Sequence, residues 1–153
     1  MVSDFLDEHR DALQRKCSGL TDEQLRMRSV PPSSMSLMGI VRHMFEVERW
    51  WFRHYVDGQV YESLLWTEEN PDGDFDDIDD VTGVETLEMW REECDHSRFV
   101  IHGVESLDQL AAFERNDSAV SVRWIMMHMI QEYARHNGHA DLIRERIDGV
   151  TGE

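Results

Sequence analysis

The chain has 153 residues, of which 41% are hydrophobic, enough for one domain with a substantial core. It carries 15 Lys and Arg residues against 32 Asp and Glu residues, a formal net charge of −17. A surface this acidic repels phosphate groups and anionic lipids, which argues against nucleic acid and membranes as partners. We therefore expect a single domain over residues 1–153 whose partner is neither nucleic acid nor a membrane.

The cysteines and the absence of targeting patterns indicate the compartment. Cys17 and Cys94 are far apart and form no CxxC motif, which is typical of free thiols in a reducing compartment. The first residues lack the basic stretch and apolar run of a signal peptide. No apolar run approaches the roughly 20 residues that a membrane helix needs. These features predict a cytoplasmic protein.

The first half of the chain predicts two long helices. Residues 3–18 place apolar side chains at helical spacing, and Gly19 follows as a stop signal. A capping sequence at Thr21 predicts one short helical turn, which the two prolines that follow would end. Ser36 can then cap a second long helix, which runs to a stop near Gly58.

The second half predicts an irregular segment and two more helices. Residues 57–83 contain an acidic, turn-rich run from Glu68 to Asp77, which we interpret as an exposed, solvated loop because it lacks the ligand spacing of a calcium loop. A third helix is expected from Val84 to His102, with a buried side formed by Leu87, Trp90, Cys94, Phe99 and Ile101. A connector over residues 107–118 then leads to the last helix.

No stretch shows the alternation of a β-strand, so the sequence predicts an all-α protein. Four helices with polar outer faces favour an antiparallel four-helix bundle. The connection between the second and third helices, roughly 25 residues, is long for a simple up-and-down arrangement. We expect this long loop to cross one end of the bundle and cover a site.

The last helix, from Ser121 to Gly149, carries the most informative pattern. At about 100° per residue, three histidines and a glutamate fall on one face: His128, Glu132, His136 and His139. Glu132 and His136 lie one turn apart, where both can bind a single cation. Such pairs also arise by chance, and a helical histidine is more often hydrogen-bonded than a ligand. Burying four ionisable groups on one stripe is nevertheless costly without a cation or polar partners.

His43, in the second helix, is the best candidate for a third ligand. It lies among apolar residues and precedes the aromatic run from Trp50 to Phe52. Two imidazoles and one carboxylate leave coordination positions for water or substrate, which is the open arrangement of a catalytic metal site. The same donors also suit non-haem iron, so the ligand types alone do not select zinc.

The segments LMGIVRHMFEVERWWF and HMIQEYARHNGHADLIRE, with the closing IDGVTG, resemble the DinB/YfiT-like metalloenzyme superfamily, and most closely its actinobacterial branch of unknown function. The resemblance implies a four-helix bundle with a divalent metal at one end, held by a histidine from helix two and an HxxxH pair from the last helix. His43 matches the first ligand, and Glu132 and His136 fall on the pair. A glutamate in the pair departs from the commonest pattern but is shared by the related mycothiol-dependent maleylpyruvate isomerases.

The same resemblance implies a function, because the better understood members are thiol-dependent S-transferases and isomerases. A divalent metal, zinc in the first place and otherwise nickel, iron or manganese, would bind a low-molecular-weight thiol of the mycothiol type for attack on an electrophile. His139 or Glu46 would orient water or move a proton. Arg135 and Arg144 would bind an anionic part of the substrate, or lie on a solvated helix face.

Two other functions fit the same residues. A metal-dependent hydrolase would activate water at the open site in place of a thiol. A metal-stabilised binding or stress-response module would use the site without turnover. The apolar surfaces of the first and third helices would also suit a homodimer.

Overall fold

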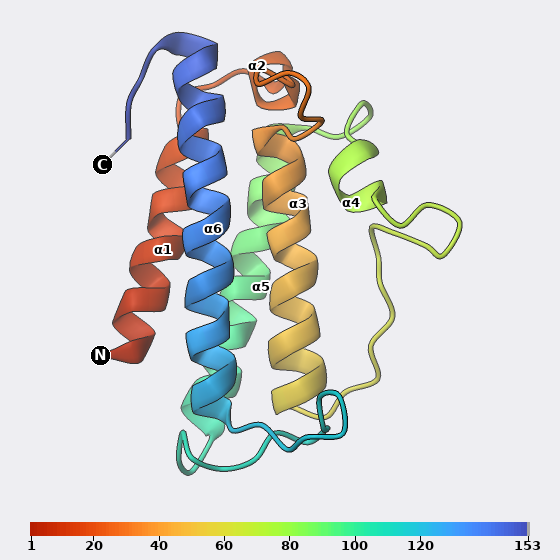
Figure 1. Ribbon diagram of the computed structural model, residues 1–153, viewed down its shortest axis with the longest axis vertical. Coiled ribbons are helices and arrows are strands. Elements are labelled where there is room, and N and C mark those ends of the chain that lie inside the picture. The colour runs from red at the N-terminus through yellow and green to blue at the C-terminus, as the bar shows by residue number, and fades with distance from the viewer. Residues whose placement is uncertain (153) are drawn as a thin grey trace.

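The computed structural model describes residues 1–152, and helices dominate it (Figure 1). Within these residues there are only isolated β-bridges and no strand, so the expectation of an all-α protein is confirmed. No helix in this part of the chain is long and apolar enough to cross a membrane. The elements in order are α1 (Val2–Cys17), α2 (Asp22–Arg26), α3 (Leu37–Glu48), the π-helix η1 (Arg49–Val56), α4 (Gly73–Asp76), α5 (Gly83–Gly103) and α6 (Val122–Asp148).

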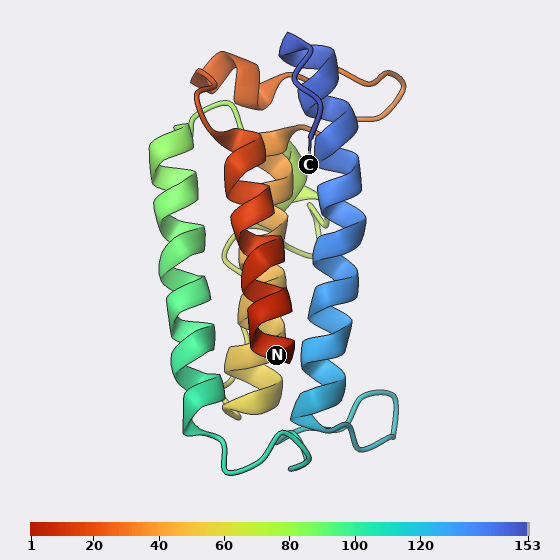
Figure 2. The same ribbon diagram turned by 90° about the vertical axis from the view of Figure 1, so that its left-hand side faces the viewer.

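Four long helical segments lie side by side, but they do not alternate in direction. In Figure 1, α1 and α6 run upward, whereas α3 with η1 and also α5 run downward, and Figure 2 agrees. The expected antiparallel order is therefore wrong, because α3 and α5 are parallel to each other and so are the neighbouring α1 and α6. Residues 57–82, here called the crossover segment, return along the length of α3 before α5 begins. At up to about 3.3 Å per residue, such a segment easily spans a helix about 30 Å long.

The helix ends follow the capping residues that the sequence supplies. The Ser36 hydroxyl accepts a hydrogen bond from the Gly39 N–H at the start of α3, and Ser121 does the same for Trp124 at the start of α6. Gly149 ends α6 with φ of +78°, a left-handed conformation that glycine adopts without strain. The last helix thus has the bounds that the sequence predicts.

One core fills the space between the four long segments. On α5 the buried positions include Trp90, Cys94, Ser97 and Val100, which follow one helical face. Phe99 points away from that face and is 75% exposed, so its predicted burial is wrong. The other large buried side chains come from α1, α3, η1 and α6, and include Leu6, Leu13, Ile40, Phe52, Met129 and Tyr133.

The crossover segment packs closely on α3 through the short helix α4. A Cβ atom added to Gly39 would lie 2.7 Å from the Phe75 carbonyl oxygen, so only glycine allows this approach. From the next turn, Arg42 donates to the carbonyl oxygens of Asp74 at 3.0 Å and Gly73 at 3.3 Å. The expectation of a solvated loop from residue 68 to 77 is therefore wrong in part, because Gly73 and Asp74 are buried.

Candidate metal centre

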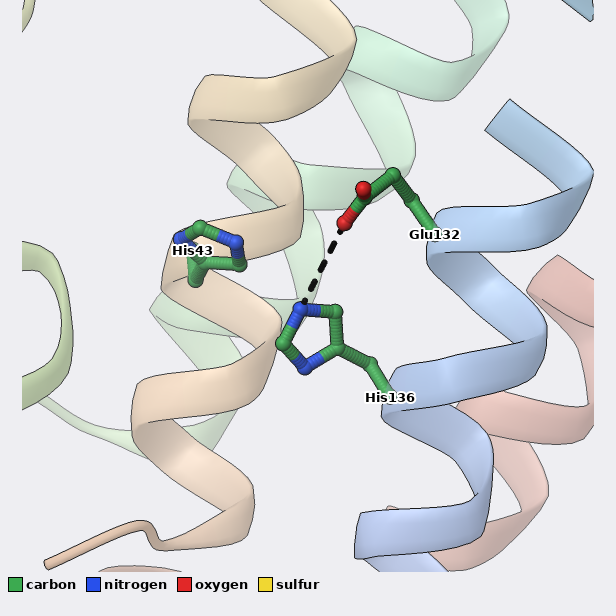
Figure 3. A group of neighbouring side chains, drawn as sticks. All are labelled: His43, Glu132 and His136. Atoms are coloured by element: carbon green, nitrogen blue, oxygen red, sulfur yellow. Dashed lines mark ion pairs between the residues drawn. The ribbon is translucent and has the colours of Figure 1, made fainter. Parts of the chain in front are cut away.

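Three side chains from α3 and α6 point into one space between these helices (Figure 3). They are His43, Glu132 and His136, and one ligand atom from each lies within 4.8 Å of the others. Glu132 and His136 follow one another on α6 at i and i+4, and His43 faces them from α3. The structure thus brings together the three residues that the sequence suggests as metal ligands.

The spacing of these atoms suits a shared cation better than a hydrogen bond. Nε2 of His136 lies 3.8 Å from Oε2 of Glu132, beyond the range of about 2.7–3.2 Å for a hydrogen bond. Two ligands at about 2.1 Å from one tetrahedral metal are about 3.4 Å apart. Closing the cluster around such an ion would need side-chain shifts of a few tenths of an ångström to about 1 Å. The donor set and its spacing therefore fit a divalent metal.

The surroundings of His136 keep its imidazole neutral, which is the form that binds metal. Burial, followed by the nearby His43, His139 and Arg135, lowers the pKa of His136 to about 3. The side chain is only 8% exposed, and its Nδ1 has no hydrogen-bond partner among the residues described. An imidazole held without a proton on one nitrogen offers a lone pair to a cation without first losing a proton.

Asp74 of α4 orients His43. Its Oδ2 lies 2.8 Å from Nδ1 of His43, and because a carboxylate can only accept, Nδ1 carries the proton. The other ring nitrogen, Nε2, is then left with its lone pair for the cluster. Oδ1 of Asp74 accepts from the Phe75 N–H at 3.0 Å, and the Phe75 ring stacks on His43 with centroids 4.4 Å apart. The hydrogen bond and the stacking together fix the orientation of the His43 imidazole.

A cavity of about 600 Å³ opens beside the cluster. His43, Glu132 and His136 line it, so the metal position would face the cavity. His139 and Arg135 also line it, as the sequence suggests, with Arg135 exposed at its side. Its remaining walls come from the loop before α3 and from α4, and consist of Ser34, Met35, Asp72, Phe75 and Asp76.

The model of the mycothiol S-transferase family matches residues 1–149, almost the whole chain. The chain belongs to this family. No curated protein matches it significantly. Among solved structures, a conserved protein from Enterococcus faecalis is similar at 14% identity, with a TM-score of 0.67 over 97% of this chain and 96% of that one. A likeness at this identity supports the fold alone.

Two residues that the sequence suggests for this site do not line the cavity beside the cluster. The Glu46 carboxylate turns to the crossover segment, where it accepts from the N–H groups of Leu64 at 2.6 Å and Leu65 at 2.8 Å. Arg144 donates to the carbonyl oxygens of Lys16 at 2.9 Å and Ser18 at 2.8 Å, and it does not line the cavity. Glu46 therefore anchors the crossover segment, and Arg144 joins α6 to the end of α1.

His128 lies one turn before Glu132 and touches it from the other side. Its Nε2 is 3.7 Å from Oε1 of Glu132, and its ring stacks on Trp124 at a centroid distance of 5.2 Å. Burial, then the opposing effect of Glu132 and the repulsion of Arg115, leaves the pKa of His128 below its usual value. The residue is thus placed to support Glu132 without joining the three-residue cluster.

The contact between Asp74 and His43 gives a direct prediction. We expect Asp74→Asn to weaken metal binding by about 10- to 100-fold, because the neutral amide is a poorer acceptor for the Nδ1 proton. Competition with a chelator of known affinity would measure this. Asp80→Asn is the matched control, since Asp80 is an exposed residue of the crossover segment that does not line the cavity, and its change should leave affinity unaltered. Equal affinities of Asp74→Asn and the unmodified protein would contradict the orienting role.

Proposed function

We propose that this chain transfers a mycothiol-type thiol to a small electrophile at a divalent metal site, with zinc as the metal and the cytoplasm as the compartment. The observation that carries the proposal is the convergence of His43, Glu132 and His136 beside a cavity of about 600 Å³ in a member of this family. The net charge of −17 favours small molecules over nucleic acid or membranes as partners.

The proposed site needs a nucleophile from outside the chain. A divalent cation held by the three residues would lower the pKa of a bound thiol and so provide a thiolate near neutral pH. Both cysteines of the chain are unsuited to this role. Burial raises the pKa of Cys17 to about 12 and that of Cys94 well above its usual value, so both stay protonated.

The residues around the cluster have separate roles in the proposed reaction. The thiol sulfur forms a bond to the electrophilic carbon as the bond from that carbon to its leaving group breaks, and the leaving group departs with the electron pair. His139, whose ring lies 5.4 Å from that of His136, is placed to accept the proton that the thiol releases. Arg135 at the side of the cavity would bind an anionic part of the thiol.

Metal content and thiol dependence test this proposal together. Protein purified without chelators should contain about one divalent metal ion per chain, and it should consume 1-chloro-2,4-dinitrobenzene only when mycothiol is added. Removal of the metal should abolish the reaction, and its return should restore it. Consumption of a substrate without any thiol would instead indicate a hydrolase, and metal binding without turnover of a panel of electrophiles would indicate a binding module.

A further inference from the structure

A second cavity, of about 310 Å³, lies between α3 with η1 and the crossover segment. Val47 and Trp50 form its inner wall, one and two turns after His43 on the same helical strip. Tyr61 and Trp66 of the crossover segment form its outer wall. His43 lines this cavity and also the larger one beside the cluster, so the two cavities share that residue.

The polar groups of the second cavity are already engaged. The Glu46 carboxylate accepts from the Tyr61 hydroxyl at 2.7 Å, from Arg49 at 3.0 Å and from two backbone N–H groups of the crossover segment. The Asp74 carboxylate accepts from His43 and from the following backbone N–H. No Lys or Arg is among the residues that line the cavity in the described chain. The cavity therefore offers a ligand aromatic and aliphatic surface, with no free cation.

We propose that the second cavity binds the uncharged aromatic body of the electrophile. Its walls supply two indole rings and a phenol ring, and Trp50 and Tyr61 meet edge to face with centroids 4.7 Å apart. A volume of about 310 Å³ accommodates a substituted single ring. A carboxylated ring is disfavoured, because Glu46 and Asp74 stand in the walls and the guanidinium of Arg49, which does not line the cavity, is already paired with Glu46.

This inference rests on the proposed function for the identity of the ligand as an electrophile. The polar cavity beside Glu132 and His136 would hold the thiol, and the aromatic cavity would hold its partner. Because His43 lines both, a ring in the aromatic cavity can present its reactive carbon near the metal cluster. The cavity thereby selects neutral aromatic electrophiles over anionic ones.

Equilibrium dialysis with an unreactive pair of probes tests the cavity without any thiol. The two probes are 1,3-dinitrobenzene and 3,5-dinitrobenzoate, which differ by one carboxylate; because a carboxylate can bind beside the metal and Arg135 in the larger cavity, the variants assign each probe to its cavity. Val47→Trp fills the second cavity and should weaken 1,3-dinitrobenzene binding by at least about tenfold, while the binding of 3,5-dinitrobenzoate stays unchanged. Val84→Trp, at an exposed position of α5, is the matched control and should bind both probes normally. Unchanged binding of 1,3-dinitrobenzene by Val47→Trp, or an equal loss of both probes in that variant, would overturn the inference.

A second variant and a kinetic measurement complete the test. Trp66→Leu removes an outer wall and should also weaken 1,3-dinitrobenzene binding, so the inference stays testable if Val47→Trp does not fold. If both variants lose the probe but no electrophile is ever consumed with thiol, the cavity is confirmed and the proposed function is wrong. If transfer occurs and Val47→Trp leaves the KM for 1-chloro-2,4-dinitrobenzene unchanged, the proposed function stands and the cavity inference is wrong.

Discussion

Replacing Glu48 with alanine is expected to lower the free energy of unfolding by about 3–5 kcal/mol, because it leaves a buried guanidinium without its main counter-charge. The Glu48 side chain is fully buried. Arg10 of α1 binds it with two hydrogen bonds, each 2.8 Å long. Burial lowers the pKa of Arg10, but the attraction of Glu48 outweighs this and holds the pKa above its usual value.

The other partners of Glu48 come from the two remaining long helices. Tyr133 of α6 donates its hydroxyl proton to Oε1 of Glu48 at 2.6 Å, and in turn accepts from Nε1 of Trp90 on α5 at 2.9 Å. The thiol of Cys94 also approaches Oε1 at 3.7 Å. One carboxylate thus connects α1, α3, α5 and α6 at the centre of the core, and its loss affects all four.

Urea unfolding at 25 °C, followed by circular dichroism, would measure the effect. Glu88→Ala is the control for loss of a glutamate, because Glu88 is exposed on α5 and its removal should change stability by less than about 0.5 kcal/mol. The double variant Arg10→Met with Glu48→Met removes both charges and should be much less destabilised than either single variant. A loss below about 1 kcal/mol for Glu48→Ala would contradict the importance of the pair.

The local features of this protein can be predicted from its sequence. The last helix begins and ends at its capping residues, Ser121 and Gly149, because both signals lie within a turn of the helix end. Glu132 and His136 share a face because their spacing alone determines it. His43 could be proposed as their partner because it lies among apolar residues of another long helix and matches the helix-two ligand of the family that the sequence resembles.

The features that depend on distant contacts could not be predicted. The parallel direction of α3 and α5 depends on where the crossover segment packs. The acidic residues of that segment resemble those of a solvated loop, so the sequence gives no indication that it packs along α3. Asp74 is buried because Gly39 admits the backbone of α4 and Arg42 binds its carbonyl groups, contacts more than 30 positions apart in the chain. Within this acidic run, the sequence feature that indicates burial is Phe75, because an aromatic side chain tends to pack against the core and to bury the residues beside it.

The crossover segment contributes residues to the walls of both cavities and also binds residues of α3 near the metal cluster. Its Asp74 orients His43, while its Tyr61 and the N–H groups of Leu64 and Leu65 bind Glu46 one turn later on α3. Arg49 adds a further hydrogen bond to the same carboxylate at 3.0 Å. Glu46 therefore holds the crossover segment in place beside the site.

The other large effect is expected at the metal cluster. Replacing His43, Glu132 or His136 with alanine should weaken metal binding by about two orders of magnitude or more, because each ligand contributes roughly 3 kcal/mol to a site of this kind. Elemental analysis after dialysis should find about one metal ion per chain in the unmodified protein and almost none in these variants.

The matched controls are His128→Ala and His139→Ala, which change histidines beside the cluster and should retain the metal. A second readout is thermal unfolding. Metal at about 100 times its Kd stabilises the folded protein by about 2.7 kcal/mol, and this gain should disappear in the three ligand variants while both controls keep most of it. Full metal content in Glu132→Ala and His136→Ala would show that the cation binds elsewhere. Loss of metal in His139→Ala alone would instead add that residue to the ligand set, because its ring already lies 5.4 Å from that of His136.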